Sequence, residues 1–180
     1  MEKYKLSKNS KMFDGVKLYR ITAVRDFGSV KNGELGGWVQ AENNLSQFGN
    51  CWVGDKAQVS GTALVSGNAR VCDYAQVSEN SRVRGTALVS GNARVSGTAL
   101  VSGNAWASGD SWLDGSAIAT KNVININGLK FNITVCDNLI KVGCHFWLKS
   151  EFDSIQYSDV KKYVDLKTYK IIKKVIKLLI

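Results

Sequence analysis

The chain has 180 residues, of which 44% are hydrophobic and 22% charged, and its formal net charge is +9. This length supports one main hydrophobic core with modest extensions, and the composition excludes an intrinsically disordered chain. The positive charge excludes mimicry of DNA. The lack of a run of about 18 apolar residues and of a secretory leader predicts a cytoplasmic protein without membrane contact.

Residues 1–46 are expected to form an N-terminal cap. A strand-like segment runs from Val16 to Val24, and a turn-rich stretch follows from Leu35 to Trp38. The chain has 17 glycines and no proline, so turns depend on Gly, Asn, Asp and Ser, and no strand loses a backbone N–H to proline. This usage favours a β architecture with many tight turns.

From Val53 to Ile124 the sequence divides into twelve consecutive six-residue units without an insertion. The first position is aliphatic in every unit: Val53, Val59, Val65, Val71, Val77, Val83, Val89, Val95, Val101, Ala107, Leu113 and Ala119. The fifth position is small in nearly every unit: Ala57, Ala63, Ala69, Ala75, Ser81, Ala87, Ala93, Ala99, Ala105, Ser111 and Ala117, then Val123. A fixed period of six with recurrent turn residues is typical of a stack of short strands, because a helix requires apolar spacings of three and four. Both positions are predicted to face a narrow interior.

Residues 47–124 resemble the left-handed parallel β-helix family built from hexapeptide repeats, in which a branched aliphatic residue is followed four places later by a small one. In that family three hexads form one triangular coil. The resemblance therefore implies a mainly β fold of about four coils, with 47–52 as a partial lead-in. The handedness follows from the resemblance alone. Because both ends of such a stack expose strand edges, caps are expected in 1–46 and 125–180.

Residues 125–180 are expected to form a β-hairpin and an amphipathic helix. The segments GLKFNITV and NLIKVG predict two strands with their turn at Cys136 to Asn138. From Ser158, the expected N-cap, apolar residues recur at helical spacing to Ile180. Seven lysines and two aspartates give this tail +5 of the net +9. Such a helix suits a membrane surface or a nucleic acid, but packing on the hairpin or on a partner subunit is favoured.

Candidate catalytic residues are few. The family that the repeats resemble is best known for trimeric acyltransferases whose coils supply a histidine as general base. The single histidine of this chain, His145, follows the coils, and its neighbour Cys144 is expected on the opposite face of a strand. We therefore expect no catalytic residue and no enzyme activity, with an acyltransferase that uses an unrecognised base as an alternative.

The four cysteines form no C-x-x-C pair and are expected to be free thiols: Cys51, Cys72, Cys136 and Cys144. A zinc site made of Cys136, Cys144 and His145 would lack a fourth ligand and the spacing of a zinc finger. No metal and no cofactor are expected.

The sixth position of each hexad, beginning with Trp52 before the first unit, is expected to face outward in three columns. The apolar members predict an oligomer interface: Leu64, Leu88, Leu100, Ile118 and Ile124. The arginines and tryptophans predict ligand contacts: Arg70, Arg82, Arg94, Trp106 and Trp112. The columns favour a homo-oligomer, with a trimer preferred, unless another segment of the same chain covers them. Arg94 beside Trp112 suits a phosphorylated ligand that can stack, although packing residues of an interface would look the same.

The segment LYRITAVRDFGSVKNGELGGWVQAENNLSQFGNCWV, the hexads and the later LIKVGC resemble a group of bacteriophage and prophage β-helix proteins that are commonly labelled transferases. This resemblance implies a phage-linked role in the cytoplasm of a host cell. It leads to the hypothesis of a non-enzymatic scaffold that neutralises a host defence component by sequestering a nucleotide immune signal at subunit interfaces. The alternatives are direct inhibition of a host defence protein and the acyltransferase.

Overall fold

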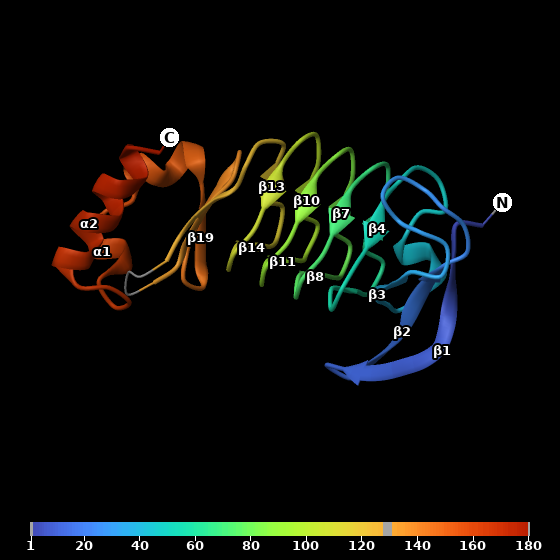
Figure 1. Ribbon diagram of the computed structural model, residues 1–180. Coiled ribbons are helices and arrows are strands. Elements are labelled where there is room, and N and C mark those ends of the chain that lie inside the picture. The colour runs from blue at the N-terminus through green and yellow to red at the C-terminus, as the bar shows by residue number, and fades with distance from the viewer. Residues whose placement is uncertain (1, 128–130, 180) are drawn as a thin grey trace.

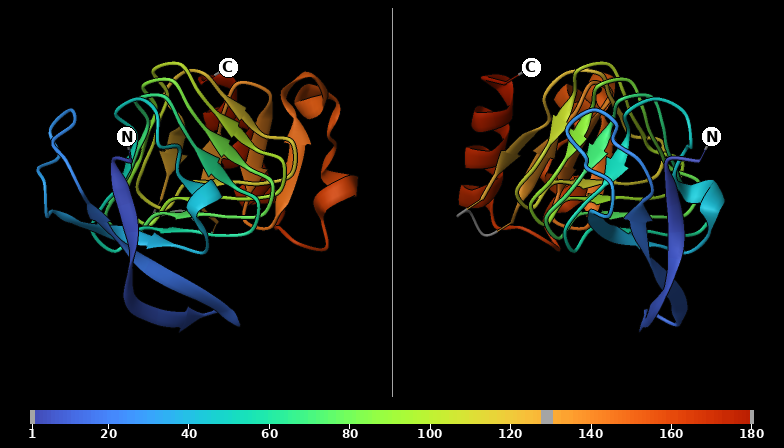
Figure 2. Two further views of the ribbon diagram at one scale, coloured as in Figure 1. Left: turned by 90° about the vertical axis from the view of Figure 1, so that its right-hand side faces the viewer. Right: turned by 45° about the vertical axis from the view of Figure 1, so that its right-hand side comes forward.

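The structure, a computed structural model, describes residues 2–127 and 131–179. An N-terminal β-hairpin, a stack of coils and a C-terminal unit of strands and helices follow one another along the molecule (Figure 1). Views turned towards the stack axis show the coils lying one behind another, with the C-terminal helices beyond the last coil (Figure 2).

The coils form the left-handed parallel β-helix that the repeats predict, with three faces of two-residue strands. One face contains β3 (Leu35–Val39), β5 (Gln58–Val59), β8 (Gln76–Val77), β11 (Arg94–Val95) and β14 (Trp112–Leu113). The second contains β4 (Trp52–Val53), β7 (Arg70–Val71), β10 (Leu88–Val89) and β13 (Trp106–Ala107). The third contains β6 (Leu64–Val65), β9 (Arg82–Val83), β12 (Leu100–Val101) and β15 (Ile118–Ala119). Each strand pairs with the strand one coil further along, so every hexad position recurs directly above its counterpart.

The interior of the coils is a column of valines and alanines. First-position residues such as Val71 and Val89 are completely buried and lie opposite each other in the parallel register. The fifth-position residues from Ala57 to Ala117 are buried as well, whereas Val123 of the last hexad is only half-buried. The hydroxyl of the buried Ser81 donates to the Ser78 carbonyl at 2.6 Å and lies 3.3 Å from the Val95 carbonyl. The hydroxyl therefore has partners, and the core tolerates it without an unsatisfied polar group.

The turns between strands require the left-handed backbone conformation. Gly97 has a φ of +67°, and a Cβ added there would lie 2.6 Å from the backbone nitrogen of Gly115 in the next coil. A side chain at this position would therefore push two coils apart. Where an acidic residue replaces the glycine, its carboxylate is used: Asp73 accepts from the Gly91 N–H and Glu79 from the Gly97 N–H, both at 2.8 Å.

The N-terminal cap continues one face of the coils. Strands β1 (Tyr4–Phe13) and β2 (Val16–Ala23) form an antiparallel hairpin, which confirms the predicted strand from Val16. The LGGW stretch is strand β3, which pairs with β2 on one side and with β5 on the other. Gly37 permits this contact, because a Cβ there would lie 2.6 Å from the Ala57 carbonyl oxygen.

Trp52 corrects the expectation that every sixth-position side chain faces solvent. Trp52 is only 2% exposed, because the rings of Tyr4 and Phe27 pack edge-on against its ring. The ring centroids of these two residues lie 6.5 and 5.4 Å from that of Trp52. Beside it, the buried Lys3 amine donates to the Cys51 carbonyl at 2.8 Å, and burial lowers the pKa of this lysine. The cap thus covers the first member of one outer column within the same chain.

The opposite end of the stack is covered by a four-stranded antiparallel sheet. It consists of β16 (Ile124–Ile126), β17 (Ile133–Val135), β18 (Leu139–Val142) and β19 (His145–Leu148). The predicted hairpin with its turn at Cys136 to Asn138 is β17 and β18, while the first three residues of its predicted first strand, 128–130, lie outside the described residues. The sheet continues the solenoid, because the N–H of Asp137 donates to the Ile118 carbonyl of the last coil at 2.9 Å.

The prediction of one helix starting at Ser158 is wrong. The chain forms the 3₁₀ helix η2 (Lys149–Ser154), the short α1 (Tyr157–Val160) and then α2 (Leu166–Lys177). Asp165 is the N-cap of α2, because its carboxylate accepts from the Thr168 N–H at 2.9 Å. The other described 3₁₀ helix, η1 (Glu42–Asn44), belongs to the N-terminal cap.

Helix α2 packs its apolar face on the C-terminal sheet. Ile172 and Ile176 are buried in one cluster with Ile133 and Ile140 of the strands. The favoured interpretation of the tail as a packing helix therefore agrees with the structure as far as Lys177, and the predicted end at Ile180 lies outside the described residues. Among the described helices, none has the length and apolar character required to cross a membrane.

Candidate functional site

The coils align the predicted ligand contacts in columns, as the period of eighteen requires. Arg94 pairs with Trp112, and Leu88 lies between Arg70 and Trp106 in the strand register. Trp106 is 50% exposed and Trp112 39%. Arg94 and Trp112 are therefore neighbours on one face of the coils, and Leu88 and Trp106 are neighbours on another.

The predicted interface residues form the apolar part of the same columns. Leu64 and Leu100 flank Arg82, and Ile118 follows Leu100 in the register. The three leucines are partly buried, whereas Ile118 and Ile124 are exposed at 39% and 36%. Ile118 lies in the last coil, whereas Ile124 does not continue a column of the coils but begins β16 of the C-terminal sheet.

Trp112 has a partner that the sequence did not indicate. The Lys141 Nζ lies 3.4 Å from the centroid of its ring and forms an ion pair with Asp114. Trp112 and Lys141 also line a groove with Asp110 and Thr134, between the last coil and the C-terminal sheet. A cation already covers this aromatic ring within the chain, so only part of the ring is available to a ligand.

The predicted arginines differ in their surroundings. Arg70 donates to the Ser29 hydroxyl at 2.9 Å and borders a polar hollow with Glu34 and Asp55. Arg82 and Arg94 are exposed on the other two faces. The structure therefore brings Arg94 and Trp112 together, but it does not bring the three arginines to one place.

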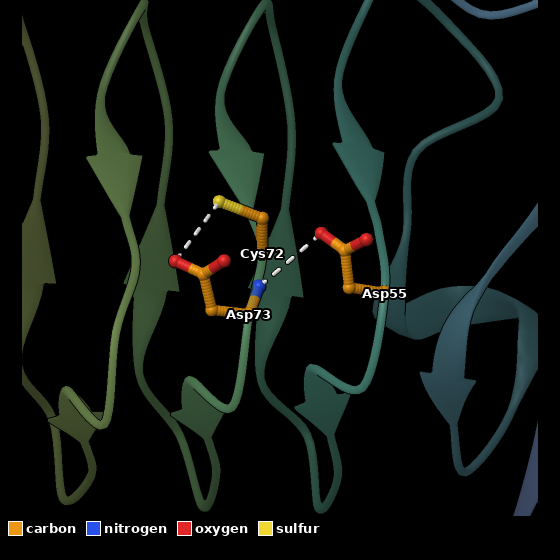
Figure 3. Close-up of side chains that lie close together, drawn as sticks. All are labelled: Asp55, Cys72 and Asp73. Carbon is orange, nitrogen blue, oxygen red and sulfur yellow. Dashed lines mark hydrogen bonds between the residues drawn. The ribbon is translucent and has the colours of Figure 1, made fainter.

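Asp55 and Cys72 of the polar hollow beside Arg70 form a group with Asp73, and the terminal atoms of the three side chains lie within 4.8 Å of one another (Figure 3). Asp55 accepts a long hydrogen bond from the Asp73 N–H at 3.4 Å, and the Asp73 carboxylate serves the Gly91 N–H of the next coil. Burial and these two carboxylates raise the pKa of the Cys72 thiol to about 11. The hydrogen bonds that link equivalent turns of successive coils, here called the turn ladder, explain why these side chains lie close together. The raised pKa keeps the Cys72 thiol protonated at neutral pH.

The cysteines and the histidine weighed as a zinc site are separated by strand β18. Cys136 is buried at one end of this strand, where its sulfur contacts the Leu139 carbonyl at 3.5 Å. Cys144 and His145 lie at the other end, after Val142. In the described parts of the chain these three residues do not form a group of metal-ligating side chains.

An apolar cavity of about 160 Å³ lies between the C-terminal sheet and the helices. Its wall combines side chains of β18, β19, η2, α1 and α2 with residues of the connecting turns: Phe131, Val142, Cys144, His145, Trp147, Phe152, Ile155, Val160, Tyr163, Val164, Tyr169, Ile172 and Lys173. A mostly apolar pocket with a few polar groups is the usual form of a small-molecule site. This cavity could not be predicted from sequence patterns, because its wall is assembled from short elements without a repeat.

His145 places its imidazole ring at this cavity. Its ring centroid lies 4.0 Å from that of Tyr163 and 6.0 Å from that of Trp147, so two aromatic side chains restrict its position. The expectation that Cys144 and His145 face opposite sides is corrected, because both border the cavity. The alternation of side chains holds only within a strand, and Cys144 lies in the turn before β19.

Two further polar side chains at the cavity, Tyr169 and Lys173, are held by backbone carbonyls. The Lys173 amine donates to the carbonyl oxygens of Phe152 and Ile155 at 2.7 and 3.3 Å, and burial lowers the pKa of this lysine. The Tyr169 hydroxyl donates to the same Ile155 carbonyl at 2.7 Å. Cys144 and Tyr163 also line the cavity, and among its described polar side chains the imidazole of His145 is the one best suited to take a proton from a bound molecule.

Comparison with known proteins shows a partial sequence similarity to a protein named as an acetyltransferase. The chain is 41% identical over 76 residues to the uncharacterized acetyltransferase YdcK of Escherichia coli strain K12, a match that covers 37% of this chain and 23% of the relative. The chain thus spans less than a quarter of the length of that relative. No family model matches the chain. The likeness to a protein named as an acetyltransferase contradicts the expectation that the chain is not an enzyme, and we correct it here.

Proposed function

We propose that the chain is an acyltransferase in which His145 acts as general base beside the C-terminal cavity. The observation that carries this proposal is that the single histidine of the chain borders an apolar cavity. The partial likeness to a protein named as an acetyltransferase supports the reaction class. The sequence alone did not indicate His145 as a base, because this histidine follows the coils and does not lie within them.

The proposed reaction is the transfer of an acyl group from a thioester to an acceptor, with His145 as the base and the apolar cavity as the acyl site. An acyl thioester places its acyl group in the cavity and its carbonyl carbon near His145. The imidazole takes the proton of an acceptor hydroxyl or amine, and the acceptor oxygen or nitrogen attacks the carbonyl carbon. The carbon–sulfur bond then breaks, and the imidazolium returns the proton to the departing thiolate. Charge and protons balance without a further reactant.

Arg94 and Trp112 are the proposed contacts for the nucleotide part of a coenzyme A thioester. An exposed guanidinium one coil from an aromatic plane suits phosphate and base together. The groove beside Trp112 and the cavity share Phe131, and they meet at the turn where Gly143 lines the groove and Cys144 the cavity. One extended donor would therefore use both.

Self-association belongs to the same proposal. The exposed Trp106, Ile118 and Ile124 support a homo-oligomer, preferably a trimer, because aromatic and aliphatic side chains are enriched at subunit contacts. Analytical ultracentrifugation of the wild type and of the Ile118→Lys variant tests it, and a monomeric wild type would contradict it. The origin in a phage and the neutralisation of a host defence component stay predictions from the sequence.

Thiol release measures the proposed reaction. Acetyl and hexanoyl coenzyme A are incubated with hydroxylamine as a small acceptor, and the rate without protein is subtracted. We expect His145→Gln to lower the rate by about 10²- to 10⁴-fold, the usual contribution of a general base. Cys72→Ser, in the coils and outside the cavity wall, is the control and should retain the rate. An unchanged rate in His145→Gln, or no reaction with wild type, would overturn the proposal.

A further inference from the structure

The cavity wall has a composition that selects apolar ligands. Eight of its side chains are aliphatic, phenylalanine or tryptophan, and none of the described residues that line it is acidic. Val160, Val164 and Phe152 are buried at 8% exposure or less and form its inner wall. The polar ends of Tyr169 and Lys173 are engaged by backbone carbonyls. A ligand inside therefore meets mostly apolar surface, except on the side where Cys144, His145 and Tyr163 lie.

The size of the cavity restricts what fits. Its volume is about 160 Å³. An engineered apolar cavity of about 150 Å³ holds one benzene molecule, so this volume corresponds to roughly six carbon atoms. A two-carbon acetyl group would leave most of the apolar wall without contacts, and a much longer chain would extend beyond the cavity.

We propose that the cavity binds an apolar group of about six carbons and thereby selects a medium-length acyl chain over acetyl. The inference rests on the proposed function, because it identifies the acyl group that His145 would act upon. The determinant of acyl length then lies among β19, η2, α1 and α2, and the coils take no part in it. Each buried methylene is expected to strengthen binding about fourfold, so four additional carbons give on the order of 10²-fold.

Titration calorimetry with hexanoyl and acetyl coenzyme A tests this selection directly. We expect wild type to bind the hexanoyl thioester at least about tenfold more tightly, a conservative fraction of the methylene effect. Val164→Phe fills the cavity and should remove the difference, whereas Leu166→Phe, at a position 44% exposed, should retain it. Equal affinity of wild type for both thioesters would overturn the inference.

A second measurement needs no variant. Hexanoate and acetate are added separately to wild-type protein, and the methyl signals of Ile155 and Ile172 are followed by NMR, with Ile118 of the coils as control. Hexanoate should shift the first two signals and leave Ile118 unchanged. Shifts of all three, or of none, would overturn the inference. Hexanoate binding without thiol release would contradict the proposed function alone and leave the apolar site in place.

Discussion

The coils and the C-terminal unit fill their hydrophobic interiors with different kinds of side chains. The coils use mostly valine and alanine in repeated layers, with residues such as Val77 and Val95 directly above one another. The C-terminal unit uses large side chains from short, unequal elements, and an apolar cavity lies among them. Strict repetition fills a thin interior completely. A cavity and its single histidine therefore occur where the repetition ends.

The two regions are joined by the contact of Asp114 with Lys141. Asp114 belongs to the last coils and Lys141 to β18, and the Lys141 side chain is only 6% exposed. The ammonium group also lies over Trp112, so one lysine links a coil turn, a coil strand and the C-terminal sheet. This contact holds the groove and the sheet that carries His145 against the coils.

Removing the carboxylate should give the largest loss of stability. Asp114→Ala leaves the Lys141 charge without its partner in a nearly buried position, and we expect a loss of about 3 kcal/mol in the free energy of unfolding. Urea denaturation measures it. The double variant Asp114→Ala with Lys141→Met should recover most of the loss, because no unpaired charge remains.

The exposed pair of Lys177 and Asp153 is the control for that experiment. Its atoms are 3.8 Å apart and both side chains are more than half exposed, so Asp153→Ala should leave the denaturation midpoint unchanged within error. If Asp114→Ala has no more effect than Asp153→Ala, the ion pair does not join the two regions.

A smaller loss should follow when two stacked coils are pushed apart. Gly97 and Gly115 have similar positive φ angles of +67° and +57°, but only at Gly97 would a Cβ meet the next coil, at 2.6 Å. Nothing lies within 4 Å of a Cβ at Gly115. Gly97→Ala should cost about 2–3 kcal/mol and Gly115→Ala about 1 kcal/mol, the backbone cost alone. Equal losses in thermal unfolding would mean that close stacking does not require glycine.

The contrast between the regions also explains what the sequence could predict. The period of six determines the coils and the columns, including the register of Arg94 with Trp112, because each position repeats its neighbour's environment. The hairpin was predictable from its strand composition. Trp52 was misplaced because the residues that cover it, Tyr4 and Phe27, lie far away in the sequence and outside the repeat.

The C-terminal cavity could not be predicted from the sequence for a related reason. The helix from Ser158 was predicted from apolar spacing, but the Asp165 cap begins a separate helix and brings Val160 and Val164 to the cavity. The pairing of Asp114 with Lys141 joins residues 27 positions apart with no periodic signal. Such contacts depend on tertiary packing, which local patterns do not encode.

Cysteine reactivity gives the finest test, because it compares the two regions without a substitution. Cys144 is exposed in the C-terminal turn, whereas Cys72 is half-buried in the coils, where burial and two carboxylates raise its pKa to about 11. Only the thiolate reacts with iodoacetamide. At pH 7.5 we expect Cys144 to be alkylated first and Cys72 at least about tenfold more slowly.

The pH dependence of Cys72 follows from the sign of its shift. A raised pKa means that the thiolate fraction is small at neutral pH and increases about tenfold for each pH unit until the pH approaches about 11. Peptide mass spectrometry after timed alkylation between pH 7.5 and 10 measures this increase, and the buried Cys51 and Cys136 report any unfolding. If Cys72 reacts as fast as Cys144 at pH 7.5 while Cys51 stays protected, the carboxylates of Asp55 and Asp73 do not restrain the thiol, and the turn ladder of the coils is looser than its hydrogen bonds indicate.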